Sequence, residues 1–451
     1  MIKNDILELT CEKLGSELEG IFFYEKMPIF VPGALPGELC RIHILKVQQR
    51  FAYGKLISVL KSSPERTAPF CKVYDQCGGC CAQHMAYAYS LQAKRQQVFD
   101  CLTRIGHLPI SIEDVPNVLG AENPIHCRNK TAVPVGKNNA DVVLGFYRKH
   151  SHSIVAITEC PIAMPSLTPV LSAVQAWIDE CRVVPYDEEL HTGWLRHIVV
   201  RENRLGQLML ILCATSQKVP GQHSLLEKLK NRLPGLHSLH LSVNKENNNV
   251  ILGHSSIKLW GNDTLSETLL GIQFEILPLS FFQVNPQQTE ILYSKVIQFC
   301  LLKPSDIVID AYAGAGTISL CMAAHCKQVI GIEIVPQAVE SANRNKQINH
   351  IENAVFYNDA VENKLPKLIA EGLQPDVIVL DPPRKGVEQP VIDAVLKARP
   401  HRVVYVSCHV PTQARDLKLL YDGGYRVSAI QSVDMFCYAA GVENIVVMTI
   451  A

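Results

Sequence analysis

The sequence has no net charge, no long apolar run and few aromatic residues. Lys and Arg together number 43, as do Asp and Glu, so the formal net charge of the 451-residue chain is zero. This balance argues against attraction of nucleic acid by bulk charge, but it leaves room for local basic patches. No apolar run reaches the roughly 18 residues that a transmembrane helix needs. The first residues, Met1-Ile2-Lys3-Asn4-Asp5, lack the apolar core of a signal peptide. We therefore expect a cytoplasmic protein without a membrane partner.

Cysteine, by contrast, is abundant. The chain has 16 cysteines, although disulfides are rare in the cytoplasm. Most, such as Cys213 and Cys300, lie in apolar runs and are typical of small core residues. Four are not: Cys71, Cys77 and Cys80 share the pattern C-x5-C-G-G-C, and Cys160 precedes a proline. Clustered thiolates favour zinc or an iron–sulfur cluster, and the spacing alone leaves both open.

The length predicts two to four domains, and the pattern changes twice along the chain. Residues 1–62 alternate short apolar runs with turns, which predicts a small β-barrel. Residues 63–280 hold the cysteine group, a helical stretch at 82–107 and several strand-like runs, which predicts a β-rich central domain. Residues 281–451 alternate strands with helices, which predicts an α/β domain with a doubly wound, mostly parallel sheet.

The last region also carries the pattern of a nucleotide-type cofactor pocket. Its first strand, 307–310, runs into Gly314-x-Gly316, where backbone can approach a ligand at the start of a helix. The third glycine of a dinucleotide site is missing, because position 319 is Ser. Carboxylates follow the next three expected strands: Glu333, Asp359 and Asp381. This order resembles class I S-adenosylmethionine-dependent methyltransferases, whose cofactor has no pyrophosphate.

A thiol and a carboxylate further along suggest what is methylated. Asp381-Pro382-Pro383 is followed by Arg384 rather than by an aromatic clamp, which disfavours methylation of an exocyclic amine. Cys408 ends the expected strand 402–406, where a thiolate could add to C6 of a pyrimidine and make C5 nucleophilic. A base must then remove the C5 proton, and Glu443 is the candidate. Taken alone, Cys408 is as compatible with an inert buried thiol.

With these motifs, the sequence resembles the RNA uracil-C5 methyltransferase family, specifically the iron–sulfur branch that makes 5-methyluridine in 23S ribosomal RNA. The resemblance covers nearly the whole chain, and residues 1–62 resemble the RNA-binding TRAM domain. It implies Cys408 as nucleophile and Glu443 as base. It further implies contacts to S-adenosylmethionine from six residues: Gln283, Tyr312, Thr317, Glu333, Asp359 and Asp381. For the cysteine group it implies a [4Fe–4S] cluster on four ligands: Cys71, Cys77, Cys80 and Cys160.

The chain departs from the family's pattern near the base. The family usually has His-Val-Glu there, with Pro-His-Thr shortly before it. This chain has Gly441-Val442-Glu443, preceded by Cys437-Tyr438-Ala439. A helper group beside Glu443 is therefore missing or supplied from elsewhere.

We expect RNA to be the partner of this chain. We also expect the chain to be a monomer. Short basic groups in the central region predict phosphate contacts: Arg128-Asn129-Lys130, Tyr147-Arg148-Lys149-His150, and Arg196-His197 with Arg201. The target uracil must leave its stack before a thiol can reach C6. The leading hypothesis is methylation of C5 of a uridine in 23S rRNA. The alternatives are methylation of a tRNA uridine, and a non-catalytic RNA-binding iron–sulfur protein.

Overall fold

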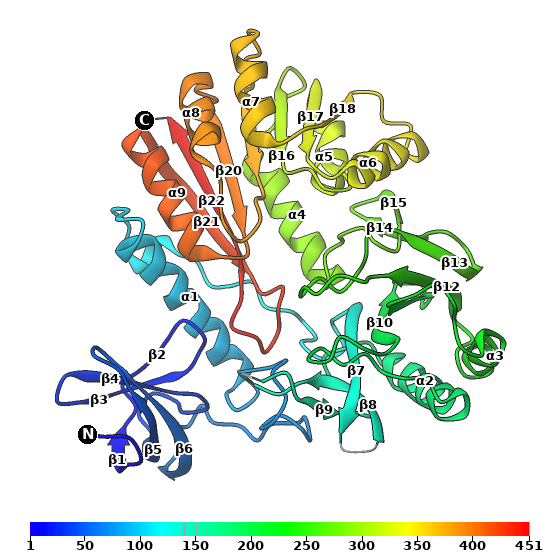
Figure 1. Ribbon diagram of the computed structural model, residues 1–451. Helices are drawn as coiled ribbons and strands as arrows, with labels where there is room; N and C mark the ends of the chain where they lie inside the picture. Colours follow the sequence, from blue (N-terminus) through cyan, green and yellow to red (C-terminus); the bar gives the residue numbers. More distant parts are fainter. Residues whose placement is uncertain (139–140, 150, 451) are drawn as a thin grey trace.

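The computed structural model describes residues 1–138, 141–149 and 151–450. Figure 1 shows three regions along the chain, each built on its own sheet, with the helix α1 (Tyr87–Arg104) between the first and the last. No helix among the described residues is long and apolar enough to cross a membrane.

The N-terminal region is one six-stranded sheet in the order β1-β5-β6-β4-β3-β2. Its strands are β1 (Ile6–Thr10), β2 (Lys13–Leu14), β3 (Gly20–Tyr24), β4 (Met27–Val31), β5 (Leu39–Val47) and β6 (Ala52–Lys61). Alternate residues such as Phe22, Ile29 and Ile42 are fully buried on its inner face, as the period of a strand requires. The described pairings leave β1 and β2 as edges, so they show a sheet and do not show the closed barrel that the sequence predicts.

The central region is a mixed seven-stranded sheet in the order β13-β12-β11-β10-β7-β8-β9. Its strands are β7 (Lys130–Asn138), β8 (Asp141–Tyr147), β9 (Ile154–Ala156), β10 (Leu195–Glu202), β11 (Leu208–Ala214), β12 (Leu236–Val243) and β13 (Ser256–Gly261). The helices α2 (Leu167–Cys181) and α3 (Gln222–Arg232) contribute Trp177 and Leu225 to its core. A hairpin of β14 (Leu265–Leu269) and β15 (Ile272–Ile276) leads out of this region.

The C-terminal sheet has the order β18-β17-β16-β19-β20-β22-β21. Its strands are β16 (Ile307–Ala311), β17 (Gln328–Glu333), β18 (Ala354–Asn358), β19 (Val377–Leu380), β20 (Arg402–Ser407), β21 (Tyr425–Val433) and β22 (Glu443–Ile450). The first five strands of the order are parallel, and β22 returns antiparallel between β20 and β21. The expected strands at 307–310, 328–333, 354–357, 376–380 and 402–406 are confirmed to within a residue or two. Ligands of such sheets bind beyond the carboxyl ends of the parallel strands.

The helix α4 (Pro286–Cys300) precedes β16. The strands are separated by α5 (Thr317–Met322), α6 (Pro336–Ile348), α7 (Val361–Ala370), α8 (Gln389–Ala398) and α9 (Val410–Asp422). The helix expected at 82–107 is observed as α1, which begins five residues later. Val98 and Leu102 of α1 share a core cluster with Leu417 of α9. Part of the segment 63–280 therefore packs against the C-terminal sheet.

Candidate active site

The pairing of β20 with β22 places Cys408 next to Glu443. Ser407 pairs with Asn444 at the end of this antiparallel ladder. Cys408 is the first residue after β20, and Glu443 is the first residue of β22. Cys408 is half-buried and Glu443 is 4 % exposed. The thiol and the carboxyl thus lie near each other where the β20–β22 ladder ends, close enough for their charges to interact.

A buried amide network fixes the backbone on both sides of this pair. The side chain of Asn444 donates to Gln413 Oε1 at 2.7 Å and accepts from the Ser432 hydroxyl at 2.7 Å. Gln413 Nε2 in turn donates to the carbonyl oxygens of Tyr405 and Asn444, at 2.9 and 3.0 Å. Because β20, β21, β22 and α9 all contribute, Glu443 cannot shift along its strand without breaking buried hydrogen bonds.

The electrostatics of the site couple four side chains. Burial raises the pKa of the Cys408 thiol, the Glu443 carboxylate adds to the rise, and the Arg384 guanidinium opposes it. Burial also raises the pKa of Glu443 well above its usual range, Asp381 adds to the rise, and Arg384 again opposes it. Arg384 is therefore the cation that favours the charged forms of both groups, the Cys408 thiolate and the Glu443 carboxylate.

Replacing Arg384 with Gln is expected to shift the pH dependence of the reaction. Loss of the cation raises the pKa of both Cys408 and Glu443, so the rising limb of activity moves to higher pH. The rate of single-turnover methyl transfer against pH measures this, and alkylation of Cys408 against pH reports the thiolate separately. Lys385→Gln, which removes an exposed neighbouring cation paired with Glu388, is the control. An unshifted profile in the Arg384 variant contradicts this role.

The predicted cofactor residues gather at one end of the C-terminal sheet. Asp359 and Asp381 directly follow β18 and β19, and Glu333 ends β17. Both oxygens of Glu333 accept backbone amides, from Gly314 at 3.0 Å and Val335 at 2.8 Å. A carboxylate has about four acceptor positions, so ribose hydroxyls still fit.

The remaining three predicted cofactor residues lie on three different segments of the C-terminal region. Tyr312 follows β16 in the left-handed region, at φ +73°. Thr317 is the first residue of α5, and its hydroxyl lies 3.0 Å from that of Tyr293. Gln283 is 8 % exposed, three residues before α4.

The two glycines of the turn have different roles. Gly314 adopts φ +55° with open space where a Cβ would point, which suits an approaching ligand. Gly316 adopts φ +77°, and a Cβ there would meet Phe356 at 2.9 Å and Ala342 at 3.0 Å. Only the first of the two glycines therefore has free space for a ligand, and the second serves packing.

Two neighbouring carboxyls suit a cationic ligand. Burial raises the pKa of Asp310 to about 7, and burial with the charge of Asp310 does the same for Asp381. Ser319 donates to Asp310 Oδ2, whereas Oδ1 is buried without a hydrogen-bond partner. S-adenosylmethionine carries a sulfonium and an ammonium, so this donor set fits that cofactor.

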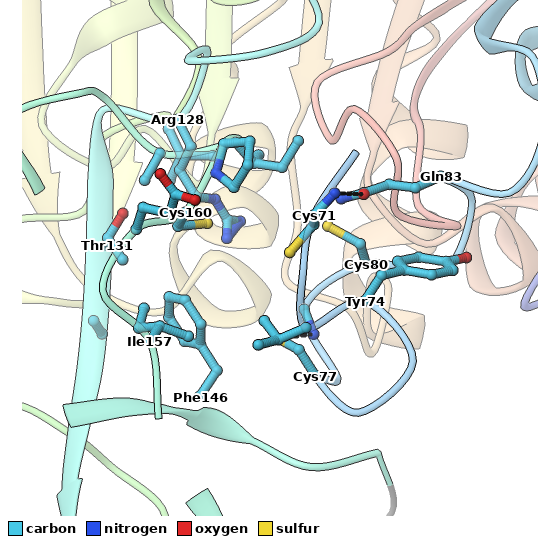
Figure 2. A pocket seen from close by; sticks show the side chains of 18 of the residues that line it. Cys71, Tyr74, Cys77, Cys80, Gln83, Arg128, Thr131, Phe146, Ile157 and Cys160 are labelled. Carbon is cyan, nitrogen blue, oxygen red and sulfur yellow. Dashed lines mark hydrogen bonds between the residues drawn. The ribbon is translucent and has the colours of Figure 1, made fainter. Parts of the chain in front are cut away.

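The four predicted metal ligands line one cavity of about 330 Å³. Figure 2 shows Cys71, Cys77 and Cys80 on the loop between β6 and α1, with Cys160 on the opposite wall, from the loop between β9 and α2. The neighbouring Cys81 is not among the lining residues. Gly79 N–H donates to Cys77 Sγ at 3.3 Å. Among the described residues, no three His, Cys, Asp or Glu side chains converge closely enough to hold a metal ion.

The cysteine loop also contacts the segment that precedes the candidate base. The carbonyl oxygen of Tyr438 accepts the amides of Cys81 and Ala82 at 2.9 and 3.1 Å. The Tyr438 ring stacks edge-on against Phe70, with centroids 5.1 Å apart. Tyr438 is one of the positions at which the chain departs from the family's pattern. In this chain it joins the loop that precedes Glu443 to the cysteine loop.

A buried ion pair holds the same segment to α1. Lys94 Nζ lies 2.5 Å from Asp434 Oδ1, with both side chains fully buried, and donates to the Phe436 carbonyl at 3.1 Å. Asp434 Oδ2 accepts the Tyr87 hydroxyl at 2.7 Å. Sequence reasoning did not find this ion pair, because a lysine on a helix is usually solvated.

Replacing Lys94 with Met is expected to lower the free energy of unfolding by about 3–5 kcal/mol, because Asp434 is left buried without its partner. Urea denaturation followed by circular dichroism measures the change. Lys418→Met, which breaks a partly exposed pair with Asp422 on α9, is the control and is expected to cost about 0–1 kcal/mol. Equal losses in the two variants would contradict the account of the buried pair.

The prediction of a phosphate-contacting surface on the central region is wrong in part. Arg196, His197 and Arg201 are 5 %, 6 % and 3 % exposed. Arg196 donates to the carbonyls of Asn244 and Glu246, and Arg201 to that of Ser280. They are buried because β10 is an interior strand of its sheet. Arg128 and Lys130 line the cysteine cavity, Arg148 is exposed, and His150 lies outside the described residues.

The order of the C-terminal sheet, five parallel strands followed by an antiparallel pair, is that of an S-adenosylmethionine-dependent methyltransferase. A protein-family model described as tRNA (uracil-5-)-methyltransferase matches residues 228–450. Two relatives described as uncharacterized RNA methyltransferases, from Clostridium tetani and Halalkalibacterium halodurans, are 42 % and 39 % identical to the chain, each over 99 % of it and 97 % of the relative. The Pyrococcus abyssi tRNA (uracil-54, C5)-methyltransferase, solved with S-adenosyl-L-homocysteine, is 26 % identical with a TM-score of 0.79, over 98 % of this chain and 100 % of that one. The chain belongs to the RNA uracil-5-methyltransferase family.

Proposed function

We propose that this protein methylates C5 of a uridine in 23S rRNA, through a covalent bond between Cys408 and C6. The observation that carries the proposal is the juxtaposition of Cys408 and Glu443 at the end of the β20–β22 ladder, beside the carboxyls of the cofactor pocket. The same juxtaposition weighs against a non-catalytic binding protein, which would need no base beside a thiol.

The chemistry follows from the two side chains. The Cys408 thiolate adds to C6 of the uracil, and the electrons of the C5–C6 double bond become nucleophilic at C5. Bound S-adenosylmethionine supplies a methyl cation equivalent to that carbon. Glu443 then removes the C5 proton, the C5–C6 double bond forms again, and the thiolate leaves. Arg384 favours the charged form of both groups.

We further propose that the cysteine cavity holds a [4Fe–4S] cluster on Cys71, Cys77, Cys80 and Cys160. The support is that four thiols from two loops surround one cavity, and thiolates are the ligands that such clusters take. A cluster spans more space than a single zinc ion, whose sulfur ligands lie about 2.3 Å from the metal. The carbonyl oxygen of Tyr438 accepts hydrogen bonds from the cysteine loop. The cluster's role is therefore to hold the segment that precedes Glu443 in place rather than to transfer electrons.

Replacing Cys77 with Ser is expected to remove most of the iron and acid-labile sulfide from anaerobically purified protein, because a ligand is lost. Cys81→Ser, which changes an adjacent thiol outside the cavity, is the matched control and is expected to keep both. Iron and sulfide assays on the two variants make the comparison. Equal contents in both variants would rule out this ligand set.

The remaining finer proposals concern the partner and the setting. We propose that residues 1–62 form a TRAM-like RNA-binding domain, that 63–280 carry the cluster and that 281–451 form the catalytic domain. The protein would act as a monomer in the cytoplasm. A second candidate substrate is tRNA, which is favoured by the likeness to the Pyrococcus abyssi enzyme over nearly its whole length.

The substrate test uses unmodified 23S rRNA and tRNA transcripts with methyl-labelled S-adenosylmethionine. Label confined to 23S rRNA is the expected result. Label in the tRNA alone would replace the leading substrate with the second candidate.

A further inference from the structure

The loop that carries Arg384 and the turn that carries Cys408 come from different parts of the C-terminal sheet. Arg384 is exposed and lies in the loop 381–388, between β19 and α8. Cys408 is half-buried and lies between β20 and α9. The Arg384 guanidinium nevertheless hydrogen-bonds the Cys408 thiol. Because a free arginine side chain samples many rotamers, this contact persists only if the backbone of the loop is held in place.

One face of α9 anchors this loop at successive backbone groups. The Thr412 hydroxyl donates to the carbonyl oxygen of Arg384 at 3.0 Å. Arg415 Nη2 donates to the carbonyl oxygen of the next loop residue at 3.0 Å, and Asp416 Oδ2 accepts the amide of Val387 at 2.9 Å. Side chains three and four positions apart share one face of a helix, so a single face of α9 holds the loop.

The close approach of α9 to the loop requires a glycine. Gly386 adopts φ +81°, and a Cβ there would collide with the side chains of Asp416 and Arg415. Its amide donates to the Pro383 carbonyl at 2.9 Å and closes a turn. Asp416 is 1 % exposed and also accepts the Tyr405 hydroxyl, at 2.7 Å. The loop, the helix and β20 are therefore packed too closely for the loop to shift alone.

Thr412 also bonds the residue that follows the nucleophile. Its hydroxyl lies 3.0 Å from the carbonyl oxygen of His409 and 3.0 Å from His409 Nδ1. On the other side of Cys408, Ser407 Oγ accepts the amide of His409 at 3.0 Å. A hydroxyl has one proton to donate and two lone pairs, so Thr412 bridges the Cys408 turn and the Arg384 loop.

We propose that Thr412 is a positioning residue for methyl transfer, whose hydroxyl holds the Arg384 loop against the turn of Cys408. The inference rests on the proposed function for the role of Cys408. It assigns to one hydroxyl the alignment of a cation with a thiol from another segment. Without that hydroxyl the loop still packs on α9 through Arg415 and Asp416, but the guanidinium loses its fixed place beside the thiol.

The charges that face Cys408 decide the sign of the expected effect. Burial raises the pKa of the thiol, Glu443 of β22 and Asp381 of the loop 381–388 add to the rise, and Arg384 opposes it. A weaker contact with Arg384 therefore raises the pKa of Cys408 further. Less thiolate is then present at a given pH, and the pH range over which the thiol becomes reactive moves upward.

Alkylation of Cys408 by iodoacetamide against pH measures this effect on anaerobically purified protein without RNA or S-adenosylmethionine. Peptide mass spectrometry distinguishes Cys408 from the other thiols. Thr412→Val keeps the shape of the side chain and removes the hydroxyl. It is expected to slow alkylation near neutral pH by about 3-fold or more, part of the roughly 10-fold that a charge-assisted hydrogen bond contributes. Thr412→Ser keeps the hydroxyl and is expected to react like the wild type.

A double substitution shows whether Thr412 acts through Arg384. If it does, Thr412→Val combined with Arg384→Gln slows alkylation no more than Arg384→Gln alone, because coupled residues do not add. Thr103→Val is the matched control, since its half-buried hydroxyl donates within α1, to the Phe99 carbonyl at 2.8 Å. The control is expected to leave the alkylation profile unchanged.

A further variant guards against a folding defect, which thermal melting by circular dichroism detects. Arg415→Gln removes an exposed side chain that anchors the same loop, and it is expected to slow alkylation in the same direction as Thr412→Val. Lys385→Gln, which removes an exposed cation of the loop paired with Glu388, gives the effect of charge alone. If Thr412→Val does not fold, an Arg415→Gln profile no different from that of Lys385→Gln would overturn the positioning role.

The outcomes separate this proposal from the catalytic one. Slowing of less than about 3-fold in Thr412→Val would overturn the positioning role, and so would an equal loss in Thr412→Ser or losses that add to those of Arg384→Gln. Slowing in Thr412→Val alone that does not add to Arg384→Gln supports it, without reference to RNA. Failure of the wild type to methylate uridine, with these alkylation results intact, would contradict the proposed function and leave the link between Thr412 and Arg384 standing.

Discussion

Glu443→Gln is expected to convert the protein from a catalyst into a trap for its own substrate. The amide has the shape of the carboxyl but cannot take up the C5 proton, so addition and methyl transfer proceed while elimination stalls. The charge of Glu443 raises the pKa of Cys408, so its removal also favours the thiolate that adds. Loss of a general base typically slows a reaction by about 10²–10⁴-fold. In this variant the slowed step is the elimination that releases the RNA. A covalent RNA–protein band that survives denaturing electrophoresis measures the effect.

Glu388→Gln provides the matched control for this result, since that carboxyl is exposed and paired with Lys385. It is expected to turn over normally and to leave no adduct. Wild-type turnover in Glu443→Gln would remove Glu443 from the mechanism, and another group would have to act as base.

Cys408→Ala is expected to abolish methyl transfer and to leave RNA binding largely intact. Without the thiolate no adduct forms, and C5 of uracil is too weak a nucleophile to take the methyl group. Transfer of labelled methyl groups and oligonucleotide affinity, measured on the same preparation, separate the two properties. The comparison variant is Cys181→Ala, which alters a half-buried thiol of α2 in the central region and should retain both. Residual methylation of uridine in Cys408→Ala would exclude the covalent route.

The C-terminal sheet was predictable because its parallel strands are short apolar runs separated by helices. The partnership of Cys408 and Glu443 was predictable only from chemistry and family resemblance. Its physical basis is the antiparallel return of β22 between β20 and β21, a long-range pairing that local patterns do not specify. In the sequence, Arg384 was notable only because it stands where an amino-methyltransferase would have an aromatic residue. Its influence on two pKa values depends on tertiary proximity.

Charged residues were the main source of error. Arg196 and Arg201 flank the run Ile198-Val199-Val200, which lacks polar alternation and is typical of a strand buried on both faces. That feature of the sequence argued against an exposed surface there. Lys94 shows the converse: α1 is polar around much of its surface, and only the packing against the 434–438 segment buries its amine. Cysteine spacing was informative for three of the four thiols, whereas Cys160 reaches the cavity through the fold of the central region.

The most direct test of the account is to map the covalent bond on an RNA that cannot complete the reaction. Substrate RNA that contains 5-fluorouridine is incubated with the protein and methyl-labelled S-adenosylmethionine, because fluorine at C5 cannot leave as the proton does. We expect a stable adduct whose digestion yields one peptide, with Cys408 joined to a fluorinated uridine that carries the labelled methyl group at C5. A methyl group on a ribose or an exocyclic nitrogen, an adduct at another cysteine, or no adduct under conditions in which ordinary RNA is methylated would contradict the mechanism.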